Sequence, residues 1–268
     1  MSVREPISLV IVGAGRMGGA VLTGALKAGV LQAGQVGIWH SNAMRAVELA
    51  ETYGVRAVDD DGLAAAERIL LAVKPQSFRQ VAPVIGRRSA AFISLLAGVS
   101  LGTLQNHLGS TRIIRAMPNL GARVGLSSTA LAHSREATRQ DTELAGRLFE
   151  AIGSVWRLPE EQFDAFTGLA GSGPAFAAVI AEALADGGVR AGLPRPAARE
   201  LSREVLLATA LLLQADTPAA LKDEVASAGG TAIAGVRAME QHGLRFSLME
   251  AVEQASLRAA ELNGSAEE

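Results

Sequence analysis

The chain has no cysteine among its 268 residues, which excludes disulfides, thiolate metal sites and a cysteine nucleophile. Its four histidines lie far apart without metal-ligand spacing, so we expect no metal centre. Long blocks of one charge are also absent, and the 25 basic residues nearly balance the 27 acidic ones. This balance gives no electrostatic reason to expect nucleic acid or an anionic membrane as partner, and we expect a small-molecule ligand.

Long hydrophobic runs are few. The longest, at 205–213, is far too short to cross a bilayer and is typical of a helix buried on most faces. The N-terminus carries an acidic residue and continues directly into a strand-like stretch, unlike a secretory signal or transit peptide. These features predict a cytoplasmic protein. An apolar content of 49% is normal for a soluble chain with a substantial core.

The pattern of the chain changes near residue 158. Before it, short aliphatic runs alternate with amphipathic segments, which predicts a parallel sheet with helices on both faces. Strands are expected at 8–13, 36–40, 68–73, 91–98 and 112–118, with weaker ones of unreadable direction at 126–132 and 154–159.

After Pro159 the strand-like runs vanish and helical patterns follow one another. We predict an α/β fold, with an N-terminal Rossmann-type doubly wound sheet over 1–158 and a second, all-helical domain over 159–268. Helices so rich in Ala, Leu and Val hide their apolar faces best against a second copy, which predicts a homo-oligomer.

A glycine-rich turn, Gly13-Ala14-Gly15-Arg16-Met17-Gly18, directly follows the first predicted strand and begins a helix. Alone, this motif is a weak signal, but in this context it predicts dinucleotide binding. The first glycine permits the tight turn, the second lets the pyrophosphate approach, and the third lets the helix pack on the strand. The helix N-terminus supplies free N–H groups. The candidate cofactor residues here are Gly13, Gly15, Arg16, Met17 and Gly18.

The second predicted strand ends at Trp39-His40-Ser41-Asn42 without the acidic residue that would hold the ribose 2′-hydroxyl of NAD. Hydroxyl, amide and guanidinium groups from Ser41, Asn42 and Arg45 suit a 2′-phosphate better. The sequence therefore favours NADP(H) and leaves NAD(H) open. A structural alternative is that Ser41 caps the next helix, and it could do both.

Further candidates follow the later predicted strands, where open α/β sheets bind ligands. Ala72, Val73, Lys74 and Pro75 follow one strand, and Ala97 follows the next. Lys74-Pro75 could instead be only a strand exit with a solvated charge. Asn119 would face the nicotinamide and position substrate or carboxamide, although a turn in which it supports its own backbone fits equally.

Near the C-terminus, Ser227-Ala228-Gly229-Gly230-Thr231-Ala232 places two glycines at the start of a helix. Glycine is costly inside a helix and useful where the backbone must approach something closely. The stretch is therefore either an ordinary helix junction or an anion site.

Together these stretches resemble the pyrroline-5-carboxylate reductase family over nearly the whole chain. The motifs are "VGAGRMGGAVLTG", "LAVKPQ", "ISLLAGVS", "RAMPN", "GSGPAF", "EALADGGVRAGLPR" and "LKDEVASAGGTAIAG". The resemblance implies an NADP(H)-binding Rossmann domain over 1–158 and a helical dimerisation and substrate-binding domain over 159–268. It further implies metal-free hydride transfer from a nicotinamide to a cyclic imine, giving proline, at a site shared between subunits. It also implies that Ser227 and the amides of Gly230, Thr231 and Ala232 hold the substrate carboxylate, where a side chain at Gly229 or Gly230 would crowd the ligand.

The chain departs from the family pattern inside several motifs. Ala232 stands where the family has a Thr whose hydroxyl reaches the ring nitrogen. Other departures are Leu120-Gly121, Ala170 and Phe176. Two alternatives stay open: a reductase of another imine or ketone on this architecture, and a catalytically weak NADP(H)-binding paralogue. A β-hydroxyacid dehydrogenase is disfavoured, because the first long helix after residue 159 has no lysine to act as acid or base.

Overall fold

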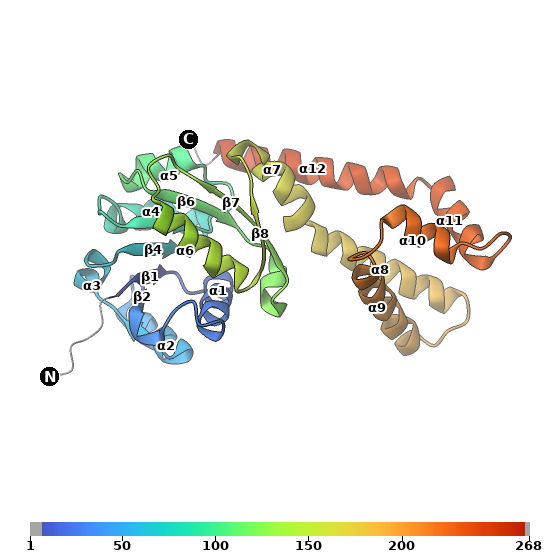
Figure 1. The fold of residues 1–268 in the computed structure, drawn as a ribbon, viewed down its shortest axis with the longest axis horizontal. Coiled ribbons are helices and arrows are strands. Elements are labelled where there is room, and N and C mark those ends of the chain that lie inside the picture. Colours follow the sequence, from blue (N-terminus) through green and yellow to red (C-terminus); the bar gives the residue numbers. More distant parts are fainter. Residues whose placement is uncertain (1–6, 266–268) are drawn as a thin grey trace. The chain divides into compact units, whose positions relative to one another are not determined.

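The computed structural model describes residues 7–265, which form two compact units (Figure 1). The first contains the chain up to Gly171 together with the residues from Ala255 onward, and the second runs from Ser172 to Gln254. This division differs from the predicted boundary at 158/159, because buried Phe163 packs with Ala130 and Ala132 of the first unit. The predicted fold class itself is confirmed.

The first unit is built on an eight-stranded sheet in the order β3-β2-β1-β4-β5-β6-β7-β8. Strands β1 to β6 pair in parallel, β7 runs antiparallel to β6, and β8 pairs in parallel with β7. The first six follow the doubly wound order, whose switch point lies between β1 and β4. The strands are β1 (Leu9–Val12), β2 (Val36–Trp39), β3 (Arg56–Ala57), β4 (Arg68–Leu71), β5 (Ala91–Ser94), β6 (Ile113–Met117), β7 (Ser127–His133) and β8 (Gly153–Arg157).

Alternating residues of β1 serve the two faces of the sheet. Leu9 and Ile11 belong to a core cluster that includes α1 and α6, whereas Val10 and Val12 belong to a second cluster with α3, α4 and α5. Strands buried on both faces explain the continuous apolar runs in the sequence. The helices of this unit are α1 (Arg16–Lys27), α2 (Ala43–Tyr53), α3 (Asp60–Ala64), α4 (Pro75–Ile85), α5 (Leu101–Leu108), α6 (Arg139–Glu150) and α7 (Phe163–Phe166), with short helical turns η1 (Ala33–Gln35), η2 (Leu120–Val124), η3 (Glu160–Gln162) and η4 (Thr167–Gly171).

Helix α6 brings a fully buried carboxylate, Asp141, against two arginines. Arg112 donates to both carboxylate oxygens at 2.8 to 3.0 Å, and Arg68 donates at 3.0 Å. Thr138 closes a capping box, its hydroxyl donating to Asp141 at 2.6 Å. Burial alone would raise the pKa of Asp141, but the hydrogen bonds from Thr138 and Arg112 outweigh it and lower the pKa. The cluster ties β4, the start of β6 and α6 together.

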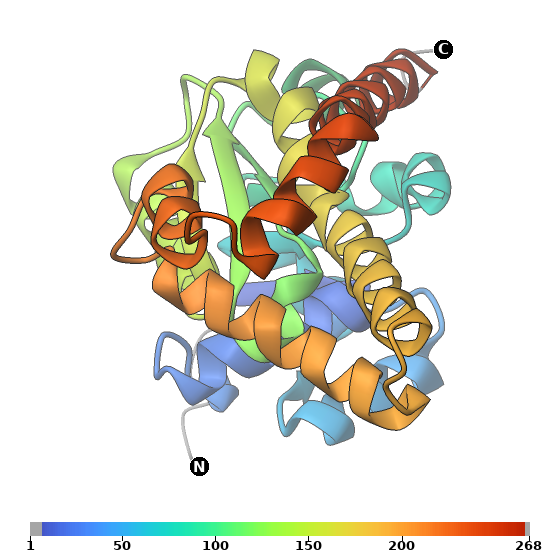
Figure 2. The same ribbon diagram turned by 90° about the vertical axis from the view of Figure 1, so that its right-hand side faces the viewer.

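The second unit is helical, as predicted. It contains α8 (Gly173–Arg190), α9 (Arg195–Leu212), α10 (Pro218–Val225), α11 (Thr231–Gln241) and the first half of α12 (Leu244–Ser265). Helices α8 and α9 form a hairpin (Figure 2). Thr217 caps α10, its hydroxyl accepting from the amide of Ala220 at 3.2 Å, and Pro218 occupies the first turn.

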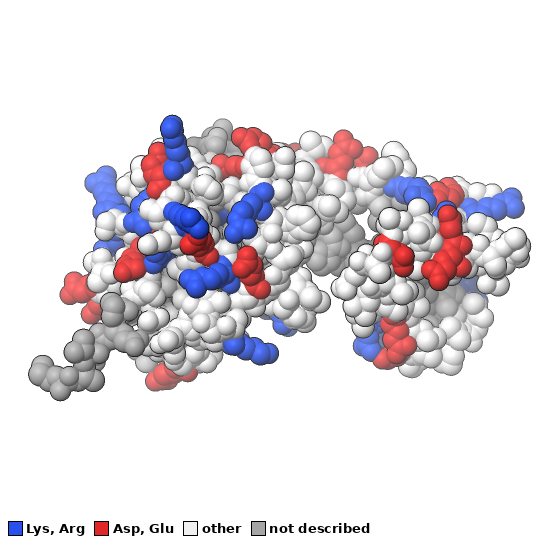
Figure 3. Space-filling view, viewed as in Figure 1, with Lys and Arg blue, Asp and Glu red and all other residues white. Residues whose placement is uncertain are grey.

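Apolar side chains cover much of the helical surface. Val205, Leu207 and Leu211 of α9 are exposed in the single chain. The helical stretch Glu160–Arg190 is, by length and composition, apolar enough to cross a membrane, and only 11% of its apolar window is buried. The expectation that the run at 205–213 is buried on most faces is wrong for the single chain: its residues are exposed or half-buried, because no other element among the described residues covers them. Charged side chains of both signs are interspersed on the face seen in Figure 3. The exposed apolar side chains of α9 and of the stretch at 160–190 form a surface that needs a partner.

Candidate functional site

The turn after β1 contacts the chain that leaves β4. Gly13 has φ +87°, and a β-carbon there would stand 2.8 Å from the amide nitrogen of Val73. A β-carbon at Gly18 would stand 2.9 Å from that of Ala72, whereas nothing lies within 4 Å of the same position at Gly15. The first and third glycines are therefore required by the fold, and the second leaves an open approach to the backbone.

Helix α1 presents unpaired amides at this turn. The first helical hydrogen bond joins the amide of Gly19 to the carbonyl of Gly15 at 2.8 Å, so the amides of Arg16, Met17 and Gly18 precede it. The first turn carries no acidic residue, which leaves the positive end of the helix dipole uncompensated. This arrangement suits a phosphate group.

A cavity of about 380 Å³ opens beside this turn. It brings together many of the predicted cofactor residues, namely Gly13, Gly15, Ser41, Ala72, Val73 and Lys74. It is also lined by residues that no motif signalled: Trp39, Leu49, Ser77, Gln80 and Val81. A second cavity, of about 400 Å³, is lined by Pro75 and Ala97 and extends to His107. Eight of the predicted cofactor residues thus divide between the two cavities, whereas Arg16, Met17, Gly18 and Asn42 line neither of them.

The loop between β2 and α2 is held by local hydrogen bonds. The side chain of Asn42, not that of Ser41, caps α2 by accepting from the amide of Arg45 at 3.2 Å. The amide of Asn42 in turn donates to Nδ1 of His40 at 3.0 Å. The interpretation of Ser41 as the cap is therefore wrong, because an asparagine one residue later takes that position. Ser41 and Arg45 both line the cavity, and Arg45 also pairs with Glu48 at 2.7 Å.

Asn119, after β6, uses its side chain to hold the surrounding backbone. Its Oδ1 accepts from the amides of Gly121 at 3.0 Å and Ser128 at 3.3 Å, and its Nδ2 donates to the carbonyl of Ala170 at 2.8 Å. This is the turn-supporting geometry that the sequence left open. Asn119 therefore fixes the exit of β6, and any role toward a ligand stays a prediction.

The Ser227–Ala232 stretch forms a turn that leads into α11. The amide of Gly230 donates to the carbonyl of Ser227 at 3.0 Å, and Gly229 has φ +68°. A β-carbon at Gly230 would collide with the Ser227 hydroxyl, while nothing lies near Gly229. The left-handed conformation explains the glycine at 229. At Gly230 the close atom is the rotatable hydroxyl of Ser227, so the turn alone does not require a glycine there, and crowding of a ligand stays a prediction.

The amides that remain for an anion differ by one residue from the prediction. The amide of Gly230 is already bonded, and the first helical bond of α11 runs from Ala234 to Gly230. The amides without a helical partner are therefore those of Thr231, Ala232 and Ile233. Gly230 is the N-cap of α11, and the amides of Thr231 and Ala232, which the sequence analysis named, are among those without a helical partner. Their role toward a substrate carboxylate stays a prediction.

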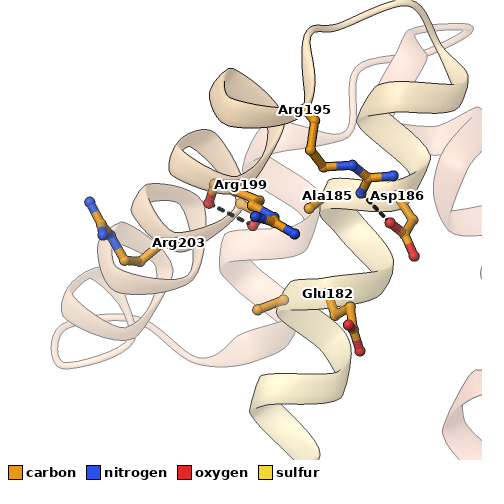
Figure 4. A pocket seen from close by; sticks show the side chains of 8 residues that line it. Glu182, Ala185, Asp186, Arg195, Arg199 and Arg203 are labelled. Atoms are coloured by element: carbon orange, nitrogen blue, oxygen red, sulfur yellow. Dashed lines mark hydrogen bonds and ion pairs between the residues drawn. The ribbon is translucent and has the colours of Figure 1, made fainter.

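Another hollow lies between α8 and α9 (Figure 4). It measures about 590 Å³ and is lined mainly by charged side chains. Arg195 pairs with Asp186 across it, and Arg203 pairs with Glu200 along α9. None of the predicted site residues lines it. Within residues 7–265, no three His, Asp or Glu side chains are grouped to hold a metal ion.

The fold and the glycine-rich turn together indicate the class of protein. A doubly wound sheet with a glycine fingerprint at its switch point, followed by helices with uncovered apolar faces, is the architecture of a nicotinamide-dependent oxidoreductase with a helical second domain. A family model described as pyrroline-5-carboxylate reductase dimerisation matches residues 160–262. A second model, described as NADP oxidoreductase coenzyme F420-dependent, matches residues 8–98.

Known proteins extend the match to the whole chain. Pyrroline-5-carboxylate reductase of Thermus thermophilus is 46% identical, over 96% of this chain and 99% of its own. The Synechocystis enzyme of the same name is 41% identical, over 96% and 98%. The solved structure of the Streptococcus pyogenes enzyme has a TM-score of 0.83 at 31% identity, over 95% and 98%. That of Plasmodium falciparum pyrroline carboxylate reductase, with NADP bound, has 0.84 at 25%, over 97% and 99%. The chain belongs to the pyrroline-5-carboxylate reductase family.

Proposed function

We propose that this protein reduces 1-pyrroline-5-carboxylate to L-proline with NADPH, the last step of proline biosynthesis. The observation that carries the proposal is the 46% identity to a pyrroline-5-carboxylate reductase over nearly the full length of both chains. The glycine fingerprint and its cavity support it from the geometry, because they supply the phosphate site that such a cofactor needs.

NADPH, when bound, supplies a hydride to the imine carbon, and the ring nitrogen keeps or takes up a proton to become the amine of proline. The chain's contribution is binding and orientation. The amides of Arg16, Met17 and Gly18 would bind the pyrophosphate. Residues Ala72–Pro75 and Ala97 would border the cofactor along the carboxyl ends of β4 and β5.

The substrate carboxylate is assigned to the start of α11. The Ser227 hydroxyl is exposed, and the amides of Thr231, Ala232 and Ile233 have no helical partner. An anion held there keeps the imine in place without a charged side chain. Ala232 offers its amide but no hydroxyl to the ring nitrogen. Loss of one such hydrogen bond costs about 1 to 3 kcal/mol, which slows a reductase without abolishing it.

Preference for NADP(H) over NAD(H) is part of the proposal. The cavity is lined by Ser41, in the loop after β2, and by Arg45, in the first turn of α2, and no carboxylate lines it. A hydroxyl and a guanidinium favour a 2′-phosphate, whereas NAD(H) usually needs an acidic partner for its ribose. Use of NADH at lower efficiency is the alternative.

The uncovered faces of the helical unit support a homodimer, or a larger assembly of dimers, with each active site shared between subunits. The match of residues 160–262 to a dimerisation model supports the same partner for the apolar helix at 160–190. No nucleic acid or membrane partner is proposed, and action in the cytoplasm stays a prediction.

The test is a reduction assay. Purified protein is mixed with NADPH and racemic pyrroline-5-carboxylate, the loss of nicotinamide absorbance is followed, and L-proline is identified as product. Reactions without imine and with NADH serve as controls, and an Ala232→Thr variant is run alongside. Cofactor binding without turnover in both proteins contradicts the proposal and favours a catalytically weak paralogue. Turnover only with a different imine or ketone favours a changed substrate.

A further inference from the structure

The last turn of α12 joins the cofactor-binding unit through a buried arginine. Arg115 of β6 is only 4% exposed, and its Nη1 donates to Glu160 at 2.8 Å. Its Nη2 donates to Oδ1 of Asn263 at 3.3 Å, and its guanidinium lies 4.7 Å above the ring of Phe163. The amide of Asn263 donates in turn to Asp164. We call these five residues the Arg115 cluster.

The same turn of α12 contacts the loop after β5. Gly98 has φ +74°, and a β-carbon there would stand 3.3 Å from the carbonyl oxygen of Leu262. Gly98 follows Ala97, which was assigned to the cofactor. Glu160 of the Arg115 cluster also accepts from the amide of Leu101 at the start of α5, at 2.8 Å. The end of α12 therefore contacts the loop after β5 at Gly98, and Glu160, which shares Arg115 with Asn263, holds the start of α5 just beyond it.

These contacts lie at the carboxyl ends of β5 and β6, on the part of the sheet beyond the switch point. The phosphate turn follows β1, and the assigned 2′-phosphate residues follow β2. The nicotinamide half of a dinucleotide extended across the switch point therefore lies over β4, β5 and β6. Arg115 is two residues from Met117, where β6 ends, and Gly98 lies just beyond β5. The end of α12 is thus attached to the two strand exits that border this half.

We infer that Asn263 and Arg115 are positioning residues for the nicotinamide half of NADPH, acting through the exits of β5 and β6. This inference rests on the proposed cofactor. The guanidinium is desolvated, so its partners must be fully placed for the charge to be tolerated. When Asn263 lies between Arg115 and Asp164, both strand exits are held. When it does not, Arg115 loses a partner and the exits gain freedom.

The two hydrogen bonds of Asn263 can be exchanged by a pair of substitutions. Asn263 accepts from Arg115 and donates to Asp164. Asn263→Asp keeps the acceptor but places two carboxylates together, whereas Asn263→Asp combined with Asp164→Asn exchanges the roles and restores both hydrogen bonds. Asn263→Ala removes both. Glu261→Gln, at an exposed residue two positions earlier on the same helix, is the matched control.

The experiment compares two ligands by calorimetry. NADPH spans the whole site, and 2′,5′-ADP occupies only the adenosine and phosphate end. We expect Asn263→Ala and Asn263→Asp to weaken NADPH binding about tenfold, which corresponds to the loss of one hydrogen bond at the nicotinamide end. Binding of 2′,5′-ADP should be unchanged, because this ligand does not reach that end. We expect the exchanged pair to recover most of the loss, and Glu261→Gln to behave as wild type.

Equal weakening of both ligands in Asn263→Ala, or unchanged NADPH binding, overturns the inference. Failure of the exchanged pair to recover NADPH binding while its unfolding temperature matches wild type also overturns it. The outcome is independent of turnover. A wild-type protein that binds NADPH but reduces no pyrroline-5-carboxylate contradicts the proposed function and leaves this comparison of ligands decisive for the positioning role.

Discussion

Gly13 and Val73 are in direct contact: a β-carbon on the glycine would lie 2.8 Å from both the amide nitrogen and Cγ1 of the valine. This contact joins the turn after β1 to the exit of β4, the two segments that border the switch point of the sheet. The backbone at Gly13 is also left-handed, so a side chain there is strained as well as crowded. The phosphate turn is therefore built into the core packing of the sheet.

Gly15 should separate cofactor binding from folding. Its φ of -76° suits any residue, and nothing lies within 4 Å of a β-carbon there. We expect Gly15→Ala to fold with an unchanged or slightly raised unfolding temperature, because the unfolded chain loses freedom. We expect NADPH binding to weaken at least about tenfold, because the methyl group meets the pyrophosphate. Gly13→Ala is the contrast and should lose stability as well. Unchanged NADPH affinity in Gly15→Ala contradicts the assigned phosphate site.

Ser227 should act on substrate binding. If its hydroxyl holds the substrate carboxylate, Ser227→Ala removes one hydrogen bond to a charged group. We expect KM for the imine to rise about tenfold, with kcat and the KM for NADPH little changed, measured by steady-state kinetics. The turn keeps its hydrogen bond from Gly230, which uses the Ser227 carbonyl. An unchanged KM for the imine excludes the assigned role.

Arg45 should determine the choice between cofactors. Its guanidinium lines the cavity and carries an exposed ion pair with Glu48 that contributes little to stability. We expect Arg45→Ala to raise KM for NADPH about tenfold and to leave KM for NADH unchanged, because only NADPH carries the 2′-phosphate. Glu48→Gln is the control, and it should not weaken NADPH binding. Equal effects on both cofactors would argue against recognition of the 2′-phosphate by Arg45.

Asp141 should set part of the stability at neutral pH. Its pKa is lower in the folded chain than in the unfolded one, so its stabilising effect is complete above the unfolded value of about 4 and is lost as pH falls through the folded value. We expect Asp141→Asn to lower the free energy of unfolding by about 2 to 4 kcal/mol at pH 7, since Arg68 and Arg112 lose their partner.

The difference between wild type and Asp141→Asn should shrink as the pH falls from about 4 through the lower folded pKa of Asp141, because over this range the carboxyl is protonated in the unfolded chain before it is protonated in the folded one. Urea unfolding followed by circular dichroism at several pH values measures both curves. Glu143→Gln on the exposed side of the same helix serves as control and should change little. A constant difference across the pH range would show that Asp141 contributes by packing and not by charge.

The exposed face of α9 should hold the dimer together. We expect Leu207→Glu to shift the protein toward monomer in analytical ultracentrifugation, because a carboxylate is placed on an apolar face that needs a partner. Turnover should fall in parallel if the active site is shared between subunits. Val84→Glu, on an exposed position of α4 in the cofactor-binding unit, is the matched control and should leave the assembly intact. If the Leu207→Glu protein sediments with the same oligomer mass as wild type, the exposed face of α9 is not the dimer interface.

Most strands of the sheet could be predicted, because strands that are buried on both faces have continuous apolar runs in their sequence. Two features were not. Strand β3 consists only of Arg56 and Ala57, too short to form a run, and its pairing with β2 depends on the position of the neighbouring strand. The reversal of β7 was unreadable because alternation does not encode strand direction.

The glycines of the candidate site could be predicted because the backbone requires them. The hydrogen-bond partners of its polar side chains could not. The fingerprint at Gly13 and Gly18 follows from positive φ and close packing, which no other residue tolerates. By contrast, Asn42 rather than Ser41 caps α2, and Asn119 bonds to backbone on three sides. Such choices depend on distances of a few tenths of an ångström that residue types do not encode.

Helix α12 begins in the helical unit and ends, from Ala255 onward, as part of the cofactor-binding unit. The two units are therefore not exchangeable modules in the genetic sense. A gene fragment that stops at Gly171 would encode the sheet and all its strands but would omit Asn263, leaving the buried guanidinium of Arg115 short of a partner. A chimera that takes only its N-terminal part from a relative should therefore take the end of α12 from that relative as well.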